Sequence, residues 1–388
     1  MIVQREMNFA IMNLAKQYPV ITITGPRQSG KTTLVKSLFS NYNYYSLEDP
    51  DIRELALTDP RAFLKKNNPG LILDEIQRAP DLLSYIQGIV DKNPKPGIFI
   101  LTGSHQFELM NSINQSLSGR TVVFKLLPFS LSELRELTKS QTVEKSILQG
   151  FYPGVHHRKL DFTIAYKNYF ETYIQRDLRE MINIKDLRLF NKFVRLCAGR
   201  IGQIFSASSL SNEVGVSAPT INSWISILEA SYIILLLEPY YENIGKRIIK
   251  SPKLYFYDVG LASYLLGIET EIQMERDPLK GNLFENLVLM ELVKKRFNKG
   301  LEHNLYFYRD SNKNEVDIIY KSGRRLIPFE IKSSETFSKS FLKGLNYINK
   351  LFPDKIEKGY VVYAGIIEHE LGEFELINYE KANETIDY

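Results

Sequence analysis

Gly25-Pro26-Arg27-Gln28-Ser29-Gly30-Lys31-Thr32 lies between an apolar run, residues 20–24, and a helical pattern that starts at Thr33. A strand, a glycine loop and a helix in this order form a phosphate cradle. The loop amides point inward, and the helix N-terminus adds partial positive charge. We therefore expect residues 25–33 to hold ATP, with Lys31 at the β- and γ-phosphates and the Thr32 hydroxyl on Mg²⁺. A chance glycine-rich turn is the alternative, but every required position is filled.

A second segment, residues 69–77, is a turn followed by a short apolar run that ends in Asp74 and Glu75. This pattern is typical of a buried parallel strand that delivers carboxylates to its C-terminal edge. We expect Asp74 to bind Mg²⁺ through water and Glu75 to orient and deprotonate the attacking water. A strand-end Asp-Glu pair alone is as often a capped turn, but its place downstream of a phosphate loop favours a site.

A third apolar strand, residues 98–104, carries the hydroxyl residues Thr102 and Ser104 at its end. We expect them beside the γ-phosphate, although a strand-end hydroxyl is commonly only a helix cap. Arg120 is a candidate arginine finger, supplied from a neighbouring subunit or within the chain, and the alternative is a solvated surface arginine. The alternation of strands and helices predicts a right-handed parallel α/β sheet with the nucleotide at the strand C-termini.

Length and composition describe an ordinary globular protein. The 388 residues are long enough for two or three domains, and the net charge of +4 is too small for a nucleic-acid polycation. A single cysteine, Cys197, excludes an intrachain disulfide and fits a reducing cytosol. No apolar run approaches the roughly 20 residues of a membrane helix, and no export signal is visible. We expect a cytoplasmic protein without a membrane partner.

The middle of the chain turns to helical periodicity and then to a helix-turn-helix pattern. Residues 131–196 predict a helical lid, which includes an amphipathic helix at 166–181. Two helices around Gly215, followed by a hairpin of 232–241 with 253–257, predict a winged helix. Six residues are candidates to face DNA or its phosphates: Asn222, Ser223, Lys246, Arg247, Lys250 and Lys253. The second helix has no Arg or Lys for base readout, so a winged helix that packs against protein is equally favoured.

The last part of the sequence places carboxylates and a lysine on a predicted helix and hairpin. Asp317 lies on one arm of the hairpin, and Glu330 and Lys332 lie on one face of the other. Glu285 lies on the preceding helix. Carboxylates that hold Mg²⁺ beside a lysine are typical of metal-dependent phosphodiester cleavage. Charged residues at strand ends are also common without any site, and whether such a site cuts is a separate question.

Taken together, these motifs resemble a family of prokaryotic ATP-binding proteins. Its members have an AAA-superfamily ATPase domain, a winged helix-turn-helix and a C-terminal domain of unknown function with the PD-(D/E)xK restriction-endonuclease-like fold. The resemblance rests on residues 25–32, 73–77, 101–104, 117–120 and 173–177, and on Glu-Val-Asp and Phe-Glu-Ile-Lys near the end. It implies ATP binding with slow hydrolysis. We expect the ATPase core at 1–135, the lid at 136–196, the winged helix at 197–257 and the nuclease-like domain at 258–388.

Three interpretations of function follow. The first is a Mg²⁺-dependent ATPase whose nucleotide state is relayed to the nuclease-like domain. The second is a nucleotide-switched module that binds DNA or protein and has a degenerate, non-cleaving C-terminal fold. The third is an ATP-dependent nuclease. ATP is the expected ligand in all three, while DNA, a protein partner or a second copy of the chain are open alternatives as partners.

Overall fold

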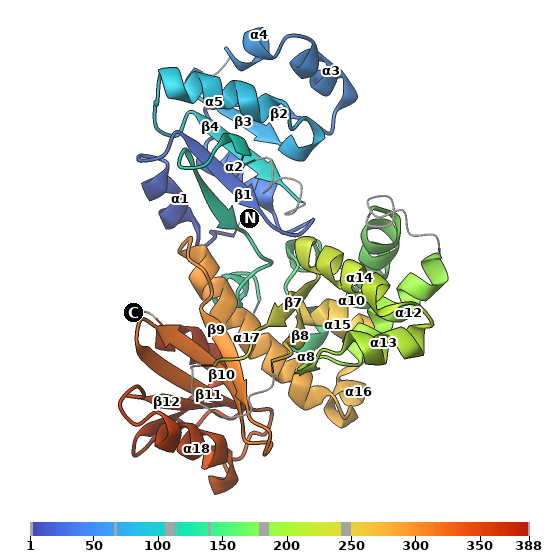
Figure 1. Cartoon of the computed structure of the whole chain (residues 1–388), viewed down its shortest axis with the longest axis vertical. Coiled ribbons are helices and arrows are strands. Elements are labelled where there is room, and N and C mark those ends of the chain that lie inside the picture. Colours follow the sequence, from blue (N-terminus) through green and yellow to red (C-terminus); the bar gives the residue numbers. More distant parts are fainter. Residues whose placement is uncertain are drawn as a thin grey trace.

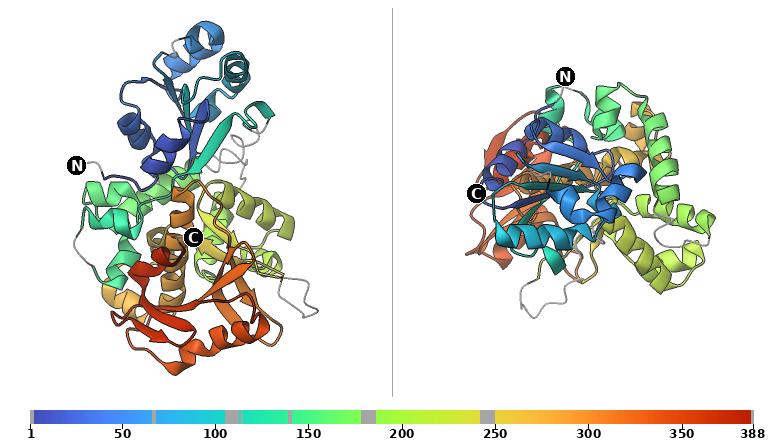
Figure 2. Two further views of the ribbon diagram at one scale, coloured as in Figure 1. Left: turned by 90° about the vertical axis from the view of Figure 1, so that its left-hand side faces the viewer. Right: turned by 90° about the horizontal axis from the view of Figure 1, so that it is seen from above.

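A computed structural model describes residues 3–65, 68–104, 113, 115–138, 141–177, 186–241 and 250–386. We refer to three parts: an N-terminal part (3–127), a middle part (128–279) and a C-terminal part (280–386). Figures 1 and 2 show the N-terminal part at one end of the molecule, with the other two parts side by side at the opposite end. No helix within the described ranges is long and apolar enough to cross a membrane.

The described strands of the N-terminal part form one parallel sheet in the order β2-β3-β4-β1-β5. The strands are β1 (Val20–Thr24), β2 (Asn43–Ser46), β3 (Leu71–Asp74), β4 (Phe99–Gly103) and β5 (Thr121–Lys125). The central strands are buried along their whole length, because helices cover both faces of a parallel sheet. This sheet confirms the predicted parallel α/β fold.

Helices pack on both faces of this sheet. They are α1 (Asn8–Leu14), α2 (Lys31–Leu38), α3 (Pro50–Thr58), α4 (Pro60–Leu64), η1 (Ile76–Arg78) and α5 (Leu82–Lys92). Leu34 of α2 packs with Ile21 on one face, and Ile86 of α5 packs with Leu73 on the other. Alternate residues of each strand point to opposite faces, so one strand serves both cores. Helices α3 and α4 are separated at Asp59, which caps α4 by accepting a hydrogen bond from the Ala62 amide.

Helices dominate the middle part, as the periodicity predicts. They are α7 (Leu131–Arg135), α8 (Val143–Gln149), α9 (Pro153–His157), α10 (Phe162–Tyr169), the π-helix η2 (Phe170–Asp177), α12 (Leu187–Ala198), α13 (Ala207–Val214), α14 (Ala218–Ala230), α15 (Val259–Leu266) and α16 (Glu271–Arg276). The end of the predicted helix at 166–181 lies outside the described residues.

The expected pair of helices and the hairpin are also present in the middle part. Gly215, at φ 90°, ends α13 in the left-handed conformation that glycine adopts readily, and Ser217 caps α14. Three short antiparallel strands follow the order β6-β8-β7: β6 (Gln203–Ile204), β7 (Ile234–Leu237) and β8 (Lys253–Phe256). Lys246 and Arg247, two predicted phosphate contacts, lie outside the described residues.

The C-terminal part is a mixed sheet between two helices. The strands follow the order β13-β14-β12-β11-β10-β9, and α17 and α18 cover its two faces. The elements are α17 (Lys280–Asn298), β9 (Leu305–Arg309), β10 (Glu315–Ser322), β11 (Arg325–Lys332), η3 (Lys339–Leu342), α18 (Lys343–Leu351), β12 (Gly359–Tyr363), β13 (His369–Leu371), β14 (Phe374–Asn378) and η4 (Tyr379–Ile386). The hairpin β10–β11 was predicted, but β13 and β14 were not.

Candidate functional site

The phosphate loop connects the C-terminal end of β1 to the first turn of α2. Gly25 has φ 146°, and a Cβ at this position would lie 2.1 Å from the Leu126 carbonyl oxygen. Gly30 caps α2 at φ 95°, and Gln28 has φ 62°. Such angles are strained for residues with a side chain, so the two glycines are required by the loop itself. The Ser29 hydroxyl is buried and has no hydrogen-bond partner among the described residues.

Lys31 folds back over this loop. Its Nζ donates hydrogen bonds to the carbonyl oxygens of Gly25 at 3.0 Å and Pro26 at 2.8 Å. Burial lowers the pKa of Lys31 to about 8, and the nearby carboxylates of Glu75 and Asp74 oppose this shift. The ammonium group is thus near the loop that would hold phosphates, and its charge depends on pH close to the physiological range.

Asp74 is the centre of a hydrogen-bond network at the C-terminal end of β3. Its Oδ2 accepts hydrogen bonds from the Thr32 hydroxyl at 2.8 Å and from the Tyr44 hydroxyl at 2.7 Å. Its Oδ1 accepts one from the Thr102 hydroxyl. The predicted residues Thr32, Asp74 and Thr102 therefore meet at one edge of the sheet, because β3 and β4 are parallel neighbours. Tyr44, on the adjacent strand β2, joins them without having been predicted.

Glu75 follows in the left-handed conformation, with φ 58°. Its backbone amide donates a hydrogen bond to the Thr102 hydroxyl at 3.2 Å. Its carboxylate oxygen Oε2 accepts hydrogen bonds from the Ser104 amide at 3.2 Å, the Ser104 hydroxyl at 3.0 Å and the Gln77 side-chain amide. Ser104 thus holds the predicted general base. A positive φ at a residue other than glycine is sparsely populated and is often found at functional sites.

Arg120 of the same chain does not belong to this hydrogen-bond network. It precedes β5, and its carbonyl oxygen accepts a hydrogen bond from the Val20 amide, at the opposite end of β1 from the phosphate loop. Its guanidinium pairs with Asp91 of α5. The expectation of an arginine finger within the chain is therefore wrong. Arg120 lies at the N-terminal end of β1, whereas the phosphate loop follows the C-terminal end of the same strand. A role for Arg120 in a neighbouring subunit stays a prediction.

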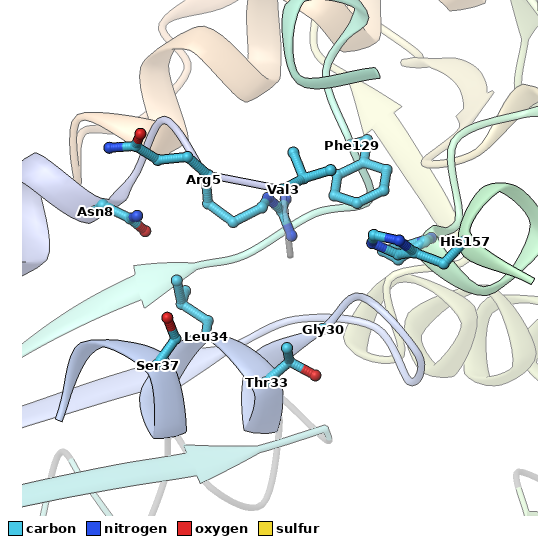
Figure 3. A pocket seen from close by; sticks show the side chains of 11 residues that line it. Val3, Arg5, Asn8, Gly30, Thr33, Leu34, Ser37, Phe129 and His157 are labelled. Atoms are coloured by element: carbon cyan, nitrogen blue, oxygen red, sulfur yellow. The ribbon is translucent and has the colours of Figure 1, made fainter. Parts of the chain in front are cut away.

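A cavity of about 320 Å³ adjoins the phosphate loop (Figure 3). Leu34, Thr33 and Ser37 of α2 form one side, and Val3, Phe129 and His157 face them from the opposite side. The remaining lining residues are Gln4, Arg5, Asn8, Gly30 and Pro153. Apolar and polar side chains thus share the lining, and small-molecule pockets combine apolar surface with polar groups that fix the orientation of a ligand.

Arg5 fastens the phosphate loop to the start of the middle part. Its buried guanidinium donates hydrogen bonds to the Ser29 carbonyl oxygen at 2.9 Å, to the Leu127 carbonyl oxygen at 2.6 Å and to the Glu133 carboxylate at 3.0 Å. It also lies 5.0 Å from the centre of the Phe129 ring. The guanidinium thus contacts two carbonyl oxygens, one carboxylate and one aromatic ring at the same time, so it holds these groups together at one wall of the cavity.

Arg27 takes part in the contacts of the loop with the rest of the chain. Its guanidinium pairs with Glu48 at 3.4 Å and lies 5.5 Å from the centre of the Tyr173 ring in η2. The predicted nucleotide-binding residue Arg27 therefore contacts the predicted lid.

The predicted carboxylates and lysine of the C-terminal part also come together. Lys332 Nζ lies 2.7 Å from Glu330 Oε1 and 3.4 Å from Asp317 Oδ2. The Ile331 amide donates a hydrogen bond to Asp317 Oδ2 at 2.7 Å. The β9–β10 register shifts between Val316 and Ile319, so Asp317 lies within an irregular stretch of β10. Burial, together with the charge of Asp317, raises the pKa of Glu330 to about 8.

Lys253, which we predicted to meet DNA phosphates, lies in this same cluster. Its side chain is 2% exposed, and Nζ lies 3.1 Å from Glu285 Oε1 and 2.7 Å from Glu315 Oε1. Glu285 Oε1 also accepts a hydrogen bond from the Tyr255 hydroxyl. Lys253 is therefore no phosphate contact, because β8 turns its side chain toward α17 and β10. By contrast, Asn222, Ser223 and Lys250 are exposed, as a nucleic-acid contact requires.

Comparison with known proteins adds the family. Residues 17–135 match an AAA domain, while residues 140–272 and 280–381 match two domains of unknown function, DUF8612 and DUF4143. An uncharacterized protein of Mycobacterium tuberculosis is 31% identical over 323 residues, which cover 82% of this chain and 71% of the relative. The chain belongs to the family of this mycobacterial protein.

Further similarity extends beyond the mycobacteria. An uncharacterized protein of Haemophilus influenzae is 25% identical over 312 residues, 71% of this chain and 74% of that protein. Among solved structures, a Walker-type ATPase of Pyrococcus abyssi covers 67% of this chain and 94% of its own, at 16% identity and a TM-score of 0.45. The AAA domain match confirms the predicted P-loop ATPase core of this family member. The winged helix and the restriction-endonuclease-like fold stay predictions.

The two predicted metal sites of this family member differ in how well their residues fit an ion. At the phosphate loop, the Thr32 hydroxyl and the Asp74 carboxylate are adjacent oxygen donors, the set that Mg²⁺ takes when substrate phosphates and water complete its shell. In the C-terminal cluster, Glu285, Asp317 and Glu330 are engaged by lysines instead. Across the described part of the chain, no group of three or more His, Cys, Asp or Glu side chains is arranged to hold a metal ion.

Four residues of the site are not predicted by the sequence patterns: Arg5, Tyr44, Phe129 and His157. Arg5, Phe129 and His157 line the cavity from three separate segments, and Tyr44 contacts Asp74 across two strands. The position of Arg5 just before the first helix and strand is only a weak sequence signal that this residue contacts the phosphate loop. Nothing in the local pattern marks the other three residues.

Proposed function

We propose that the N-terminal part binds ATP and hydrolyses it with Mg²⁺. One observation carries this proposal: the phosphate loop adjoins a cavity of about 320 Å³ that shares Gly30 and Thr33 with it. Phosphates on the loop and a nucleoside in the cavity account for both features with a single ligand. The AAA domain match over residues 17–135 supports the same reading.

The cavity walls suit an adenosine. Val3, Leu34 and Phe129 offer apolar surface on opposite sides, which suits a flat base. Asn8, Ser37 and other polar side chains at the rim are available for hydrogen bonds with the base and the ribose. Cofactor pockets combine apolar surface with polar groups that orient the ligand, and this cavity offers both.

The residues around the phosphate loop have different roles in the proposed ATP hydrolysis. Lys31 must leave the carbonyl oxygens of Gly25 and Pro26 to meet the β- and γ-phosphates. Thr32 and Asp74 hold Mg²⁺, which neutralises the charge that develops on the phosphates. Glu75 accepts the proton of the attacking water, and Ser104 orients its carboxylate.

Phosphate release with and without the Lys31→Ala substitution tests this proposal. We expect turnover to vanish in Lys31→Ala and fluorescent ATP to lose most of its affinity. Lys95→Ala is the matched control, because Lys95 is an exposed lysine of the same part. Wild-type turnover in Lys31→Ala would reject the assignment.

A continuous set of contacts supports a relay from the nucleotide to the C-terminal part. Arg5 joins the Ser29 carbonyl oxygen to Glu133, which belongs to α7. The Leu131 amide of α7 donates a hydrogen bond to Glu291 of α17 at 2.8 Å. Because α17 also carries Glu285, a shift of the loop on nucleotide binding has a short path to the carboxylate cluster.

A second contact set connects the loop with the β7–β8 sheet. The hydroxyls of Thr24, the last residue of β1, and Tyr232 lie 2.8 Å apart. Tyr232 is fully buried and has φ 56°, a strained angle for an aromatic residue. A position under strain directly behind the phosphate loop suits a segment that responds to the nucleotide.

The second candidate function is a nucleotide switch that binds DNA or protein and does not cleave. The contacts of Glu75 favour it, because its carboxylate oxygen Oε2 already accepts three hydrogen bonds from Ser104 and Gln77 and must give up part of them to reach an attacking water. The exposed Asn222 and Ser223 of α14 and the exposed Lys250 are the residues for a DNA partner. Tight ATP binding with turnover far below about 1 s⁻¹ would identify a switch, and turnover of about 1 to 10³ s⁻¹ an ordinary enzyme.

A further inference from the structure

The carboxylate cluster of the C-terminal part contains cations supplied by the chain itself. Glu285, Glu315, Asp317 and Glu330 are its carboxylates, and Lys253, Lys332 and Arg309 pair with them. Lys332 belongs to the same hairpin as its partners. Lys253 comes from β8 of the middle part, and it is the more deeply buried of the two lysines.

Each carboxylate that the resemblance assigns to a metal ion is already engaged. Glu285 Oε1 accepts hydrogen bonds from both the Lys253 ammonium group and the Tyr255 hydroxyl. Asp317 Oδ2 accepts a hydrogen bond from the Ile331 amide, and Glu330 Oε1 accepts one from the Lys332 ammonium group.

The second oxygen of Glu330 does not offer a free ligand either. Oε2 is buried without a hydrogen-bond partner among the described residues. It faces the start of α18, where a Cβ added to Gly344 would lie 2.6 Å from it. Residue 344 must therefore be a glycine for α18 to approach Glu330 this closely, and the helix backbone covers that side of the carboxylate.

We propose that the ammonium group of Lys253 replaces a metal ion in this cluster and fastens β8 to α17 and β10. A cation is needed there, because buried carboxylates without a counter-charge are strongly destabilising. Lys253 is well placed for this role. Its stem lies in a fully buried strand, its Nζ contacts carboxylates from two elements, and the Phe307 ring of β9 lies 5.5 Å from it.

This proposal separates the cluster from metal-dependent cleavage. As long as Lys253 occupies its place, its ammonium group supplies the positive charge at Glu285 Oε1 that a metal ion shared with Asp317 and Glu330 would otherwise supply. The cluster then serves as a junction between the middle and C-terminal parts. The proposal does not depend on ATP hydrolysis at the phosphate loop.

Mn²⁺ titration of the nucleotide-free full chain, followed by the electron paramagnetic resonance of free Mn²⁺, tests the proposal. We expect wild type and Asp317→Asn to bind Mn²⁺ alike, so that no binding depends on the cluster. Lys253→Met, which keeps the apolar stem, should gain a Mn²⁺ site that the added Asp317→Asn substitution removes. Lys250→Met, an exposed lysine three residues earlier, is the matched control and should gain nothing.

Two results would overturn the proposal. One is Mn²⁺ binding in wild type that Asp317→Asn abolishes, and the other is a folded Lys253→Met variant that gains no site. If Lys253→Met does not fold, thermal unfolding of Lys253→Met with Glu285→Gln replaces it. Removing both charges should then restore a cooperative unfolding transition, whereas a double variant that also fails to fold would contradict the pairing.

Discussion

Replacing Arg5 by methionine tests how the nucleotide site is held together. The substitution keeps much of the apolar stem beside Phe129 but removes the guanidinium. Glu133, which is 2% exposed, then loses its cation, and the carbonyl oxygens of Ser29 and Leu127 lose their donor. We expect both the stability of the N-terminal part and its affinity for nucleotide to fall.

The structure sets the size of the loss. Removing one partner of a buried ion pair costs about 3–5 kcal/mol. Glu133 keeps two hydrogen bonds, from the amides of Glu6 at 2.8 Å and Ser130 at 2.9 Å, so we expect the lower end of this range. A loss of about 3 kcal/mol lowers the melting temperature by roughly 6–12 °C for a domain of about 150–250 residues. The hydrogen bond to the phosphate loop, worth about 1.5 kcal/mol, corresponds to about tenfold weaker ATP binding.

Calorimetric unfolding and titration with a fluorescent ATP analogue measure the two effects. Arg61→Met is the control, because Arg61 is an exposed arginine of the same part. Combining Arg5→Met with Glu133→Gln should recover part of the melting temperature, since the buried charge is gone. A shift below about 2 °C in Arg5→Met, or no recovery in the double variant, would refute the reasoning.

Three further predictions concern the phosphate loop and its neighbours. Burial lowers the pKa of Lys31 to about 8, and the proposed contact with the phosphates needs its protonated form, so kcat/KM for ATP should fall above pH 8. A flat profile from about pH 7 to 9.5 would contradict this. Tyr44→Phe removes a hydrogen bond from Asp74, so half-maximal phosphate release should need about tenfold more Mg²⁺, with kcat restored at saturation. Gly25→Ala should abolish ATP binding in a fluorescence titration, because its Cβ would lie 2.1 Å from the Leu126 carbonyl oxygen.

The core of the nucleotide site was predictable because its signals are local. The phosphate loop requires glycine at two neighbouring turns, and a strand must precede it and a helix follow it, all within one short stretch. The parallel sheet follows from the alternation of strands and helices, and parallel strands bring Asp74 and Thr102 to the same edge. The C-terminal hairpin was predictable for the same reason, since period-two patterning places Glu330 and Lys332 on one face.

The tertiary structure decided which of these residues act together. Arg120 lies at the end of the sheet opposite to the phosphate loop, and Lys253, which we predicted at the surface, is buried beside Glu285. The tertiary structure also formed the cavity from Val3, Phe129 and His157, which are far apart in the sequence. A local pattern determines the backbone geometry of its own segment, but the burial and partners of a side chain depend on which distant elements pack against it.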